Sequence, residues 1–160
     1  MIIRTDFSVT GFGKRWTHCA QLANYLARFV SANENDPERS TTLLSTYFNE
    51  LLEAIFRKHE NTGKIKLEFK RQYNRIVVSA HIPADDGAVS FYRKTVELAN
   101  QPDPMSWYRE RLEHDPTEEE YMTLGLLELA VVYNSRLRLS EHQNGELVLI
   151  IEFPLSEDDI

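Results

Sequence analysis

Hydrophobic positions recur at the spacing of an amphipathic helix along two stretches in the first third of the chain. Residues 39–58 carry a full apolar stripe, which predicts a helix with one face in the core: Leu43, Leu44, Tyr47, Phe48, Leu51, Leu52, Ile55 and Phe56. Residues 16–30 predict an earlier helix with an apolar face made of Ala20, Leu22, Tyr25, Leu26 and Phe29. The polar segment 31–40, which contains Pro37, predicts a loop between them. Gly63 is expected to end the second helix.

Three further helices are predicted in the second half of the chain. Residues 88–100 and 105–114 predict two of them, separated by the helix-breaking sequence QPDP. The third spans about 118–133 and follows a capping box, in which Thr117 precedes Glu120 by three residues. Because this helix is apolar on almost every side from its fourth residue onward, we expect it to be buried on most sides.

Alternation of apolar and polar residues replaces the helical period in two places. Residues 64–70 and 75–82 predict the strands of one hairpin. The sequences RLRLS and ELVLIIEF predict a second hairpin, with Asn144-Gly145 at its tip. Two hairpins among helices indicate an α/β (α+β) two-layer sandwich, with a mixed or antiparallel sheet that carries helices on one face.

Composition and charge narrow the class of protein. With 160 residues, of which 42% are hydrophobic and 27% charged, we expect one globular domain over 1–155 and a flexible acidic tail at 156–160. The net charge of −7 argues against a nucleic-acid partner. The single cysteine, Cys19, suits a reducing compartment. No signal-peptide pattern and no apolar run of about 18 residues is evident, so we expect no membrane partner and a cytoplasmic location.

Candidate chemistry begins at the rim of helix 39–58, where Glu50 and Ala54 lie one above the other. A carboxylate there could act as a general base or orient a water molecule. Alternatively, these carboxylates are solvated surface charges without a function. Glu53 then has Arg57 as its i+4 ion-pair partner. Gly125 interrupts a helix of good formers at a cost of about 1 kcal/mol relative to Ala. Close helix–sheet packing would explain it, as would close approach by a ligand or by another backbone.

Two other groups of residues are candidates for a binding site or a metal site. Asp85, Asp86 and Gly87 follow a predicted strand, where they form either an acidic site loop or an ordinary turn. The five histidines are scattered without metal-ligand spacing, and no second cysteine is present. We therefore expect no metal site built from histidine and cysteine.

The order of these elements resembles the ATP-binding domain of the histidine-kinase-like superfamily, which has the GHKL or Bergerat fold. The resemblance covers about residues 39–155, from NELLEAIFRKH to the closing hairpin, and is greatest to small stand-alone bacterial members such as the anti-sigma-factor serine kinases. It implies that Glu50 positions or activates the attacking group. Ala54 stands where the family has the asparagine that coordinates Mg²⁺, and an alanine cannot bind a cation.

The other family motifs are matched only in part. Gly125 and Leu126 resemble the end of the glycine-rich lid. The acidic and glycine residues of the adenine-contacting box are matched most nearly by Asp85, Asp86 and Gly87. Residues 88–116 stand where the family has its lid, and they either fill the pocket or present a surface.

These observations leave three hypotheses. The first is a degenerate family member that acts in bacterial signalling through protein–protein contacts, with nucleotide binding weak or lost. The resemblance implies an anti-sigma-antagonist (STAS-type) or receiver-domain partner, and the apolar side of the first helix belongs either to the core or to a homodimer. The second is an active serine kinase that uses ATP and Mg²⁺, with Glu50 as base and Asp85 or Asp86 on adenine. The third is a domain whose similarity is only architectural.

Overall fold

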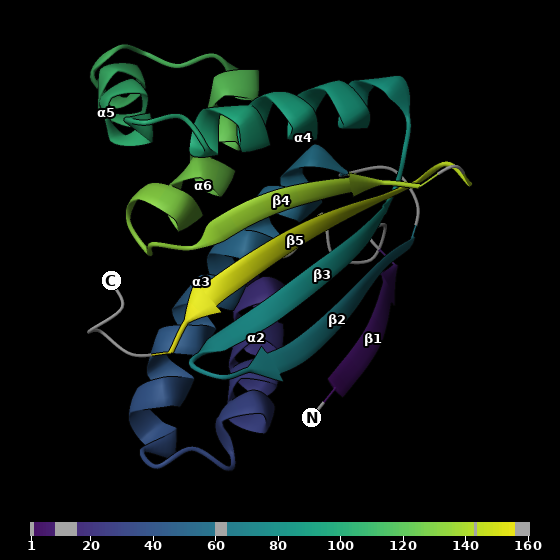
Figure 1. The fold of residues 1–160 in the computed structure, drawn as a ribbon, viewed down its shortest axis with the longest axis vertical. Coiled ribbons are helices and arrows are strands. Elements are labelled where there is room, and N and C mark those ends of the chain that lie inside the picture. Colours follow the sequence, from purple (N-terminus) through teal and green to yellow (C-terminus); the bar gives the residue numbers. More distant parts are fainter. Residues whose placement is uncertain (1, 9–15, 60–63, 143, 156–160) are drawn as a thin grey trace.

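Five strands and five helices make up the part of the chain that the structure describes, residues 2–8, 16–59, 64–142 and 144–155 of the computed structural model (Figure 1). The strands form one antiparallel sheet in the order β1-β2-β3-β5-β4. Their bounds are β1 (Ile2–Ser8), β2 (Lys64–Gln72), β3 (Arg75–Pro83), β4 (Arg136–Glu141) and β5 (Glu146–Pro154). The helices are α2 (Trp16–Ser31), α3 (Pro37–Lys58), α4 (Asp86–Ala99), α5 (Pro104–Glu113) and α6 (Glu118–Val131).

The predicted two-layer sandwich is confirmed. Helices α2 and α3 lie side by side behind the sheet, while α4, α5 and α6 gather at its β4 end (Figure 1). The strands alternate as expected, since Ile65, Leu67 and Phe69 of β2 are buried whereas the residues between them are partly exposed. An antiparallel sheet with one packed face and one polar face requires this alternation.

Helix α3 is the centre of the core. The eight apolar residues predicted for its face are buried, except that Leu43 is only half-buried. The ring of Tyr47 stacks on that of Phe153 with centroids 4.9 Å apart, and Phe48 meets Phe69 edge-on at 5.0 Å. The helix begins two residues earlier than predicted because Asp36 caps it, accepting a hydrogen bond from the Arg39 amide, and a proline fits the first turn.

The prediction of which residues form the buried face of α2 was wrong for most of them. Ala20 is exposed, and Tyr25 and Phe29 are 64% and 52% exposed, whereas Leu22 is half-buried. The buried face consists of Cys19, Ala23, Leu26, Ala27 and Val30. The two buried alanines have short side chains that let α2 approach α3 closely, so the small residues rather than the aromatic ones face the neighbouring helix.

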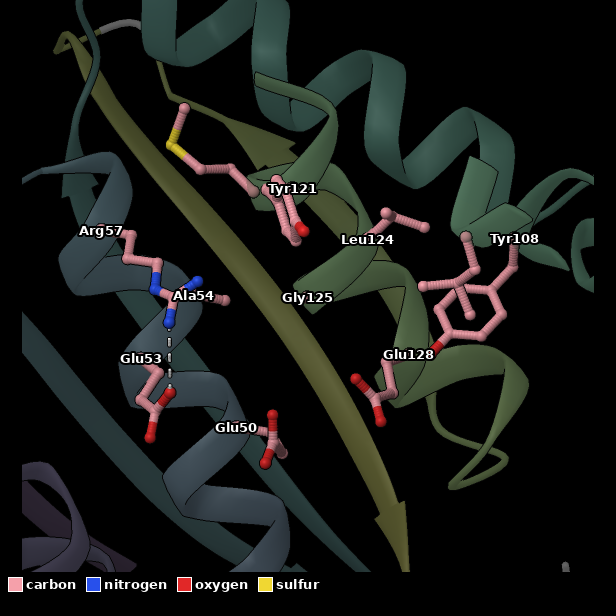
Figure 2. Close-up of a pocket in the computed structure, with 11 residues that line it drawn as sticks. Glu50, Glu53, Ala54, Arg57, Tyr108, Tyr121, Leu124, Gly125 and Glu128 are labelled. Atoms are coloured by element: carbon pink, nitrogen blue, oxygen red, sulfur yellow. Dashed lines mark ion pairs between the residues drawn. The ribbon is translucent and has the colours of Figure 1, made fainter. Parts of the chain in front are cut away.

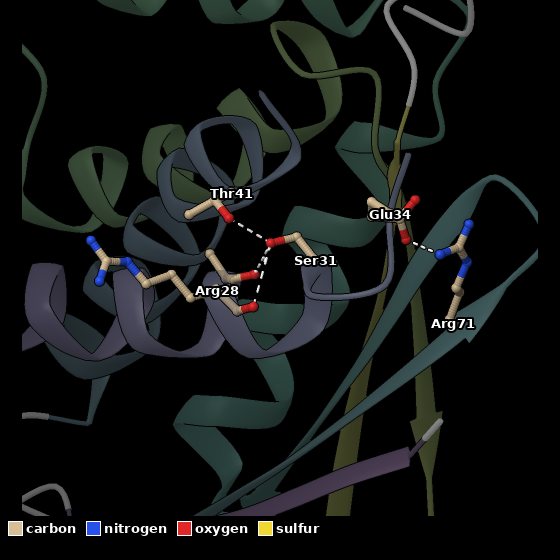
Figure 3. A network of polar contacts seen from close by, with 6 residues as sticks. Arg28, Ser31, Glu34, Thr41 and Arg71 are labelled. Atoms are coloured by element: carbon tan, nitrogen blue, oxygen red, sulfur yellow. Dashed lines mark hydrogen bonds and ion pairs between the residues drawn. The ribbon is translucent and has the colours of Figure 1, made fainter. Parts of the chain in front are cut away.

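A polar network joins α2 to α3 and to the sheet (Figure 3). The buried hydroxyl of Ser31 donates to the Ala27 carbonyl at 2.7 Å and is hydrogen-bonded to the Thr41 hydroxyl of α3. In the turn that follows α2, Glu34 forms an ion pair with Arg71 of β2. These contacts fix the turn between the two helices against the second strand.

Helix α4 begins within the segment 83–87 that was predicted to be a loop. Asp85 is its N-cap and accepts a hydrogen bond from the Ala88 amide at 2.7 Å, so Asp86 and Gly87 belong to the first helical turn. At the other end, the Asn100 side chain donates to the Leu137 carbonyl at 3.1 Å. This contact ties α4 to the edge strand β4.

Helix α6 starts at the predicted capping box. The Thr117 hydroxyl accepts from the Glu120 amide at 3.3 Å, and the Glu120 carboxylate accepts from the Thr117 amide at 2.9 Å. Every residue from Met122 to Ala130 is buried or half-buried, as expected, although Tyr121 is exposed.

Strand β1 was not predicted, and two other predictions fall outside the described residues. The strand pairs with β2 through residues far along the chain, with Ile3 opposite Phe69. The predicted C-terminal turn at Gly63 and the tail 156–160 lie outside the part that the structure describes. Among the described helices, none is both long and apolar enough to cross a bilayer.

Candidate functional site

A cleft of about 190 Å³ lies between α3 and α6, with α5 along one side (Figure 2). Helix α3 contributes residues at the rim of its apolar stripe, and α6 contributes the face that begins at Tyr121. Helix α5 contributes Tyr108 and Leu112, so part of the segment 88–116 lines the cleft. The lining residues are Glu50, Glu53, Ala54, Arg57, Tyr108, Leu112, Tyr121, Met122, Leu124, Gly125 and Glu128.

The two helices meet where Ala54 faces Gly125. Ala54 is only 4% exposed, and a Cβ atom at Gly125 would lie 3.7 Å from the Cβ of Ala54. Close packing of the glycine against the sheet was therefore the wrong explanation, because its neighbour is helix α3. A distance of 3.7 Å is ordinary van der Waals contact, so the position would also accept alanine.

Carboxylates dominate the charge of the cleft. Glu50 of α3 and Glu128 of α6 point into the space between the helices, and the ring of Tyr108 reaches toward Glu128 (Figure 2). Burial raises the pKa of Glu50, the negative charges of Glu128 and Glu53 raise it further, and Arg57 opposes them. Burial also raises the pKa of Glu128. The cleft therefore disfavours additional negative charge.

Arg57, the cation among the lining residues, is already paired. Its guanidinium lies 3.8 Å from the Glu53 carboxylate, which confirms the predicted i+4 pair. Glu53 also accepts a hydrogen bond of 2.9 Å from the Asn49 side chain. These contacts hold Arg57 toward its own helix, where it offsets one of the three carboxylates.

Glu50, Ala54 and Gly125, which the sequence singled out, thus share one cleft. Asp85, Asp86 and Gly87 lie at the start of α4 and are not among the residues that line it. Glu128 and Tyr108 were missed. Glu128 follows Gly125 by three residues on the same helix, so helical spacing alone could have placed it beside the glycine. No local signal marks Tyr108.

A second polar group lies where α3 ends against α4. His59 is 3% exposed and Tyr92 is fully buried, with His59 Nε2 2.9 Å from the Tyr92 hydroxyl. The two rings are nearly parallel, at 10° and 5.7 Å between centroids. Burial lowers the pKa of His59 to about 4, although the charge of Asp85 acts in the opposite direction. The pair is therefore neutral at physiological pH, and it holds the two helices together.

The residues of the cleft do not fit a nucleotide with Mg²⁺. Its volume is below the roughly 300 Å³ at which small-molecule pockets begin. Three carboxylates would oppose the phosphates, and Ala54 has no oxygen to offer a cation. Within the described residues, no group of three or more His, Cys, Asp or Glu side chains is arranged to hold a metal ion.

The fold and this cleft place the protein in a structural class, the two-layer α/β domains, and it has a small acidic cleft between two core helices. No protein-family model matches the chain, and no curated protein matches it. Among solved structures, it is similar to a chain in the crystal structure of the SiaB-SiaC complex from Pseudomonas aeruginosa. The two chains are 18% identical with a TM-score of 0.56, and the match covers 96% of this chain and 88% of the other. At this identity the likeness shows a shared fold.

Proposed function

We propose that this protein is a cytoplasmic signalling protein that acts by binding a partner protein, through a histidine-kinase-like domain whose nucleotide site has degenerated. The observation that carries the proposal is that Ala54 of α3 and Gly125 of α6 face each other, at the two positions where the family resemblance places its Mg²⁺ ligand and the end of its lid. The cleft that remains beside this contact is small and acidic.

The similar structure supports a protein partner. It belongs to a complex of two proteins, and its fold spans nearly the whole of this chain. A domain of this architecture is therefore able to present a surface to another protein. The resemblance to anti-sigma-factor kinases favours a partner of the anti-sigma-antagonist (STAS) type or a receiver domain.

The experiment is crosslinked capture of the full-length chain at native expression level, followed by mass spectrometry. Before crosslinking, the lysates are treated either with MgATP or with apyrase and EDTA, which remove nucleotide and metal. We expect one protein to be enriched in stoichiometric amount under both conditions. A complex that forms only with MgATP, or no specific partner in either sample, would contradict the proposal.

A second candidate function is an active ATP-dependent serine kinase. The observation that favours it is Glu50, which lies in the cleft with a raised pKa, as suits a general base. The two functions are separated by Glu50→Gln. This variant would abolish phosphoryl transfer by a kinase, whereas we expect it to leave capture of the partner unchanged.

A further inference from the structure

The face of the sheet opposite α2 and α3 carries none of the described helices (Figure 1). Three consecutive rows of cross-strand neighbours form this open face. The register places Lys70, Val77, Glu152 and Arg136 in the first row. The second row is Arg4, Glu68, Ser79, Ile150 and Arg138. The third is Asp6, Lys66, His81, Val148 and Ser140.

The charge of the open face is opposite to that of the chain. The whole protein has a net charge of −7. The three rows instead hold more cations than carboxylates, namely Arg4, Lys66, Lys70, Arg136 and Arg138 against Asp6, Glu68 and Glu152. The face is thus a cationic region on an acidic molecule.

The ion pairs on this face place the cations outermost. The Arg4 side chain is 66% exposed and lies 3.1 Å from Glu68, which is 25% exposed. Arg138 is 64% exposed above Glu152, which is 14% exposed. At these two pairs a molecule that approaches the face therefore meets a guanidinium group before a carboxylate, whereas Asp6 of the third row is an exposed carboxylate.

Two cations of the first row have no carboxylate partner among the described residues. Lys70 on β2 and Arg136 on β4 are both exposed, and neither forms an ion pair there. Between them the sheet offers apolar contact area. Val77 and Ile150 are half-buried and supply this area, whereas Val148 is only 5% exposed.

We propose that the open face of the sheet is the docking surface for an acidic segment of the partner protein, whose carboxylates meet Lys70 and Arg136 while its apolar side chains pack on β3 and β5. This inference rests on the proposed function, since it assigns a surface to the same partner. Charge complementarity selects an acidic occupant. The interspersed carboxylates and the apolar strip select a protein segment over a polyphosphate chain, which would gain from neither.

The test uses the full-length protein and a fluorescein-labelled synthetic peptide in which glutamate alternates with valine and threonine. Fluorescence anisotropy measures its binding to wild type, to the variant Lys70→Glu/Arg136→Glu, and to the control Lys94→Glu/Arg109→Glu. The control changes the net charge equally, at exposed positions of α4 and α5. We expect the first variant to bind about tenfold more weakly and the control to stay within about twofold of wild type.

Three results would overturn this inference: no binding of the peptide by wild type, equal weakening in both variants, or tighter binding of single-stranded oligothymidylate through the same two residues. Circular dichroism of each variant checks that it is folded. The proposed function has its own test, the capture experiment, and is contradicted if wild type captures no partner protein. If the variant Lys70→Glu/Arg136→Glu captures the partner as well as wild type does, the proposed function is supported, but the open face is not the docking surface.

Discussion

Gly125 is a residue whose substitution gives a simple expectation. It lies inside α6, where glycine costs about 1 kcal/mol relative to alanine. A Cβ atom there would make only an ordinary contact with Ala54. We therefore expect Gly125→Ala to raise the free energy of unfolding by up to about 1 kcal/mol and the melting temperature by about 2–4 °C. Thermal denaturation checks this, and a loss of stability would mean that the helices pack closer than 3.7 Å suggests.

Ala54 gives the opposite expectation. Asparagine at this position would match the magnesium ligand of the superfamily that the sequence resembles, but the site is 4% exposed and faces α6. We expect Ala54→Asn to lower the free energy of unfolding by about 1–3 kcal/mol, because the larger side chain overpacks the helix contact. Urea denaturation measures the change, with Ala54→Ser as the smaller polar control. A stable variant that gains MgATP binding would show that the cleft can open into a nucleotide site.

His59 makes the stability of the protein depend on pH. Its pKa is about 4 in the folded state, below the ordinary value of 6.5, so between these values the unfolded chain binds more protons. Stability is therefore lost as pH falls from 6.5 toward 4, by an amount on the order of 2–3 kcal/mol. His59→Gln keeps a polar partner for the Tyr92 hydroxyl but does not titrate.

The measurement for His59 is the midpoint of urea unfolding at several pH values for both proteins. We expect the curve of the His59→Gln variant to be flatter over this window. The other titrating groups are common to both proteins, so they cancel in the difference. Parallel curves would mean that His59 has the same pKa in the folded and the unfolded protein.

At the scale of elements, the cap of α6 supports one wall of the cleft. Thr117→Ala removes the hydroxyl that accepts from the Glu120 amide, and it should lower the free energy of unfolding by about 0.5–2 kcal/mol. Thr117→Asp is the control, since aspartate caps equally well and suits the positive end of the helix dipole. Equal destabilisation by both variants would show that the threonine acts through packing instead.

The elements also show what could be predicted from the sequence. The stripe of residues 39–58 is long and regular, so helix α3 and its buried face followed from the periodicity. The face of α2 did not, because apolar residues lie all round it and the fit against α3 decides which are buried. Strand β1 depends on pairing between Ile3 and Phe69, a contact that local alternation cannot reveal.

The candidate site was predictable to a similar degree. Glu50 and Ala54 lie on one helix, so their place on its rim followed from helical geometry. Their meeting with Gly125 and Glu128 depends on how α6 packs against α3, which only the folded structure provides. Asp85 is the N-cap of α4 in the structure. This role could have been predicted, because an N-cap side chain accepts from the amide three residues later, here that of Ala88.

At the scale of the whole molecule, the protein has two unlike surfaces. One is an acidic cleft between core helices, too small for a nucleotide. The other is the open face of the sheet, where cations lie outermost. These two features are the basis of the proposal that the domain holds a protein partner rather than transfers a phosphoryl group.

The measurement that tests this claim most directly is calorimetric titration of the full-length protein with ATP and Mg²⁺, with ADP as a comparison. We expect no heat of binding from a folded sample, because Ala54, Gly125 and the carboxylates of the cleft leave no place for the phosphates. Saturable binding with a Kd of about 10 μM or tighter would contradict this expectation. The protein would then be a nucleotide-binding protein.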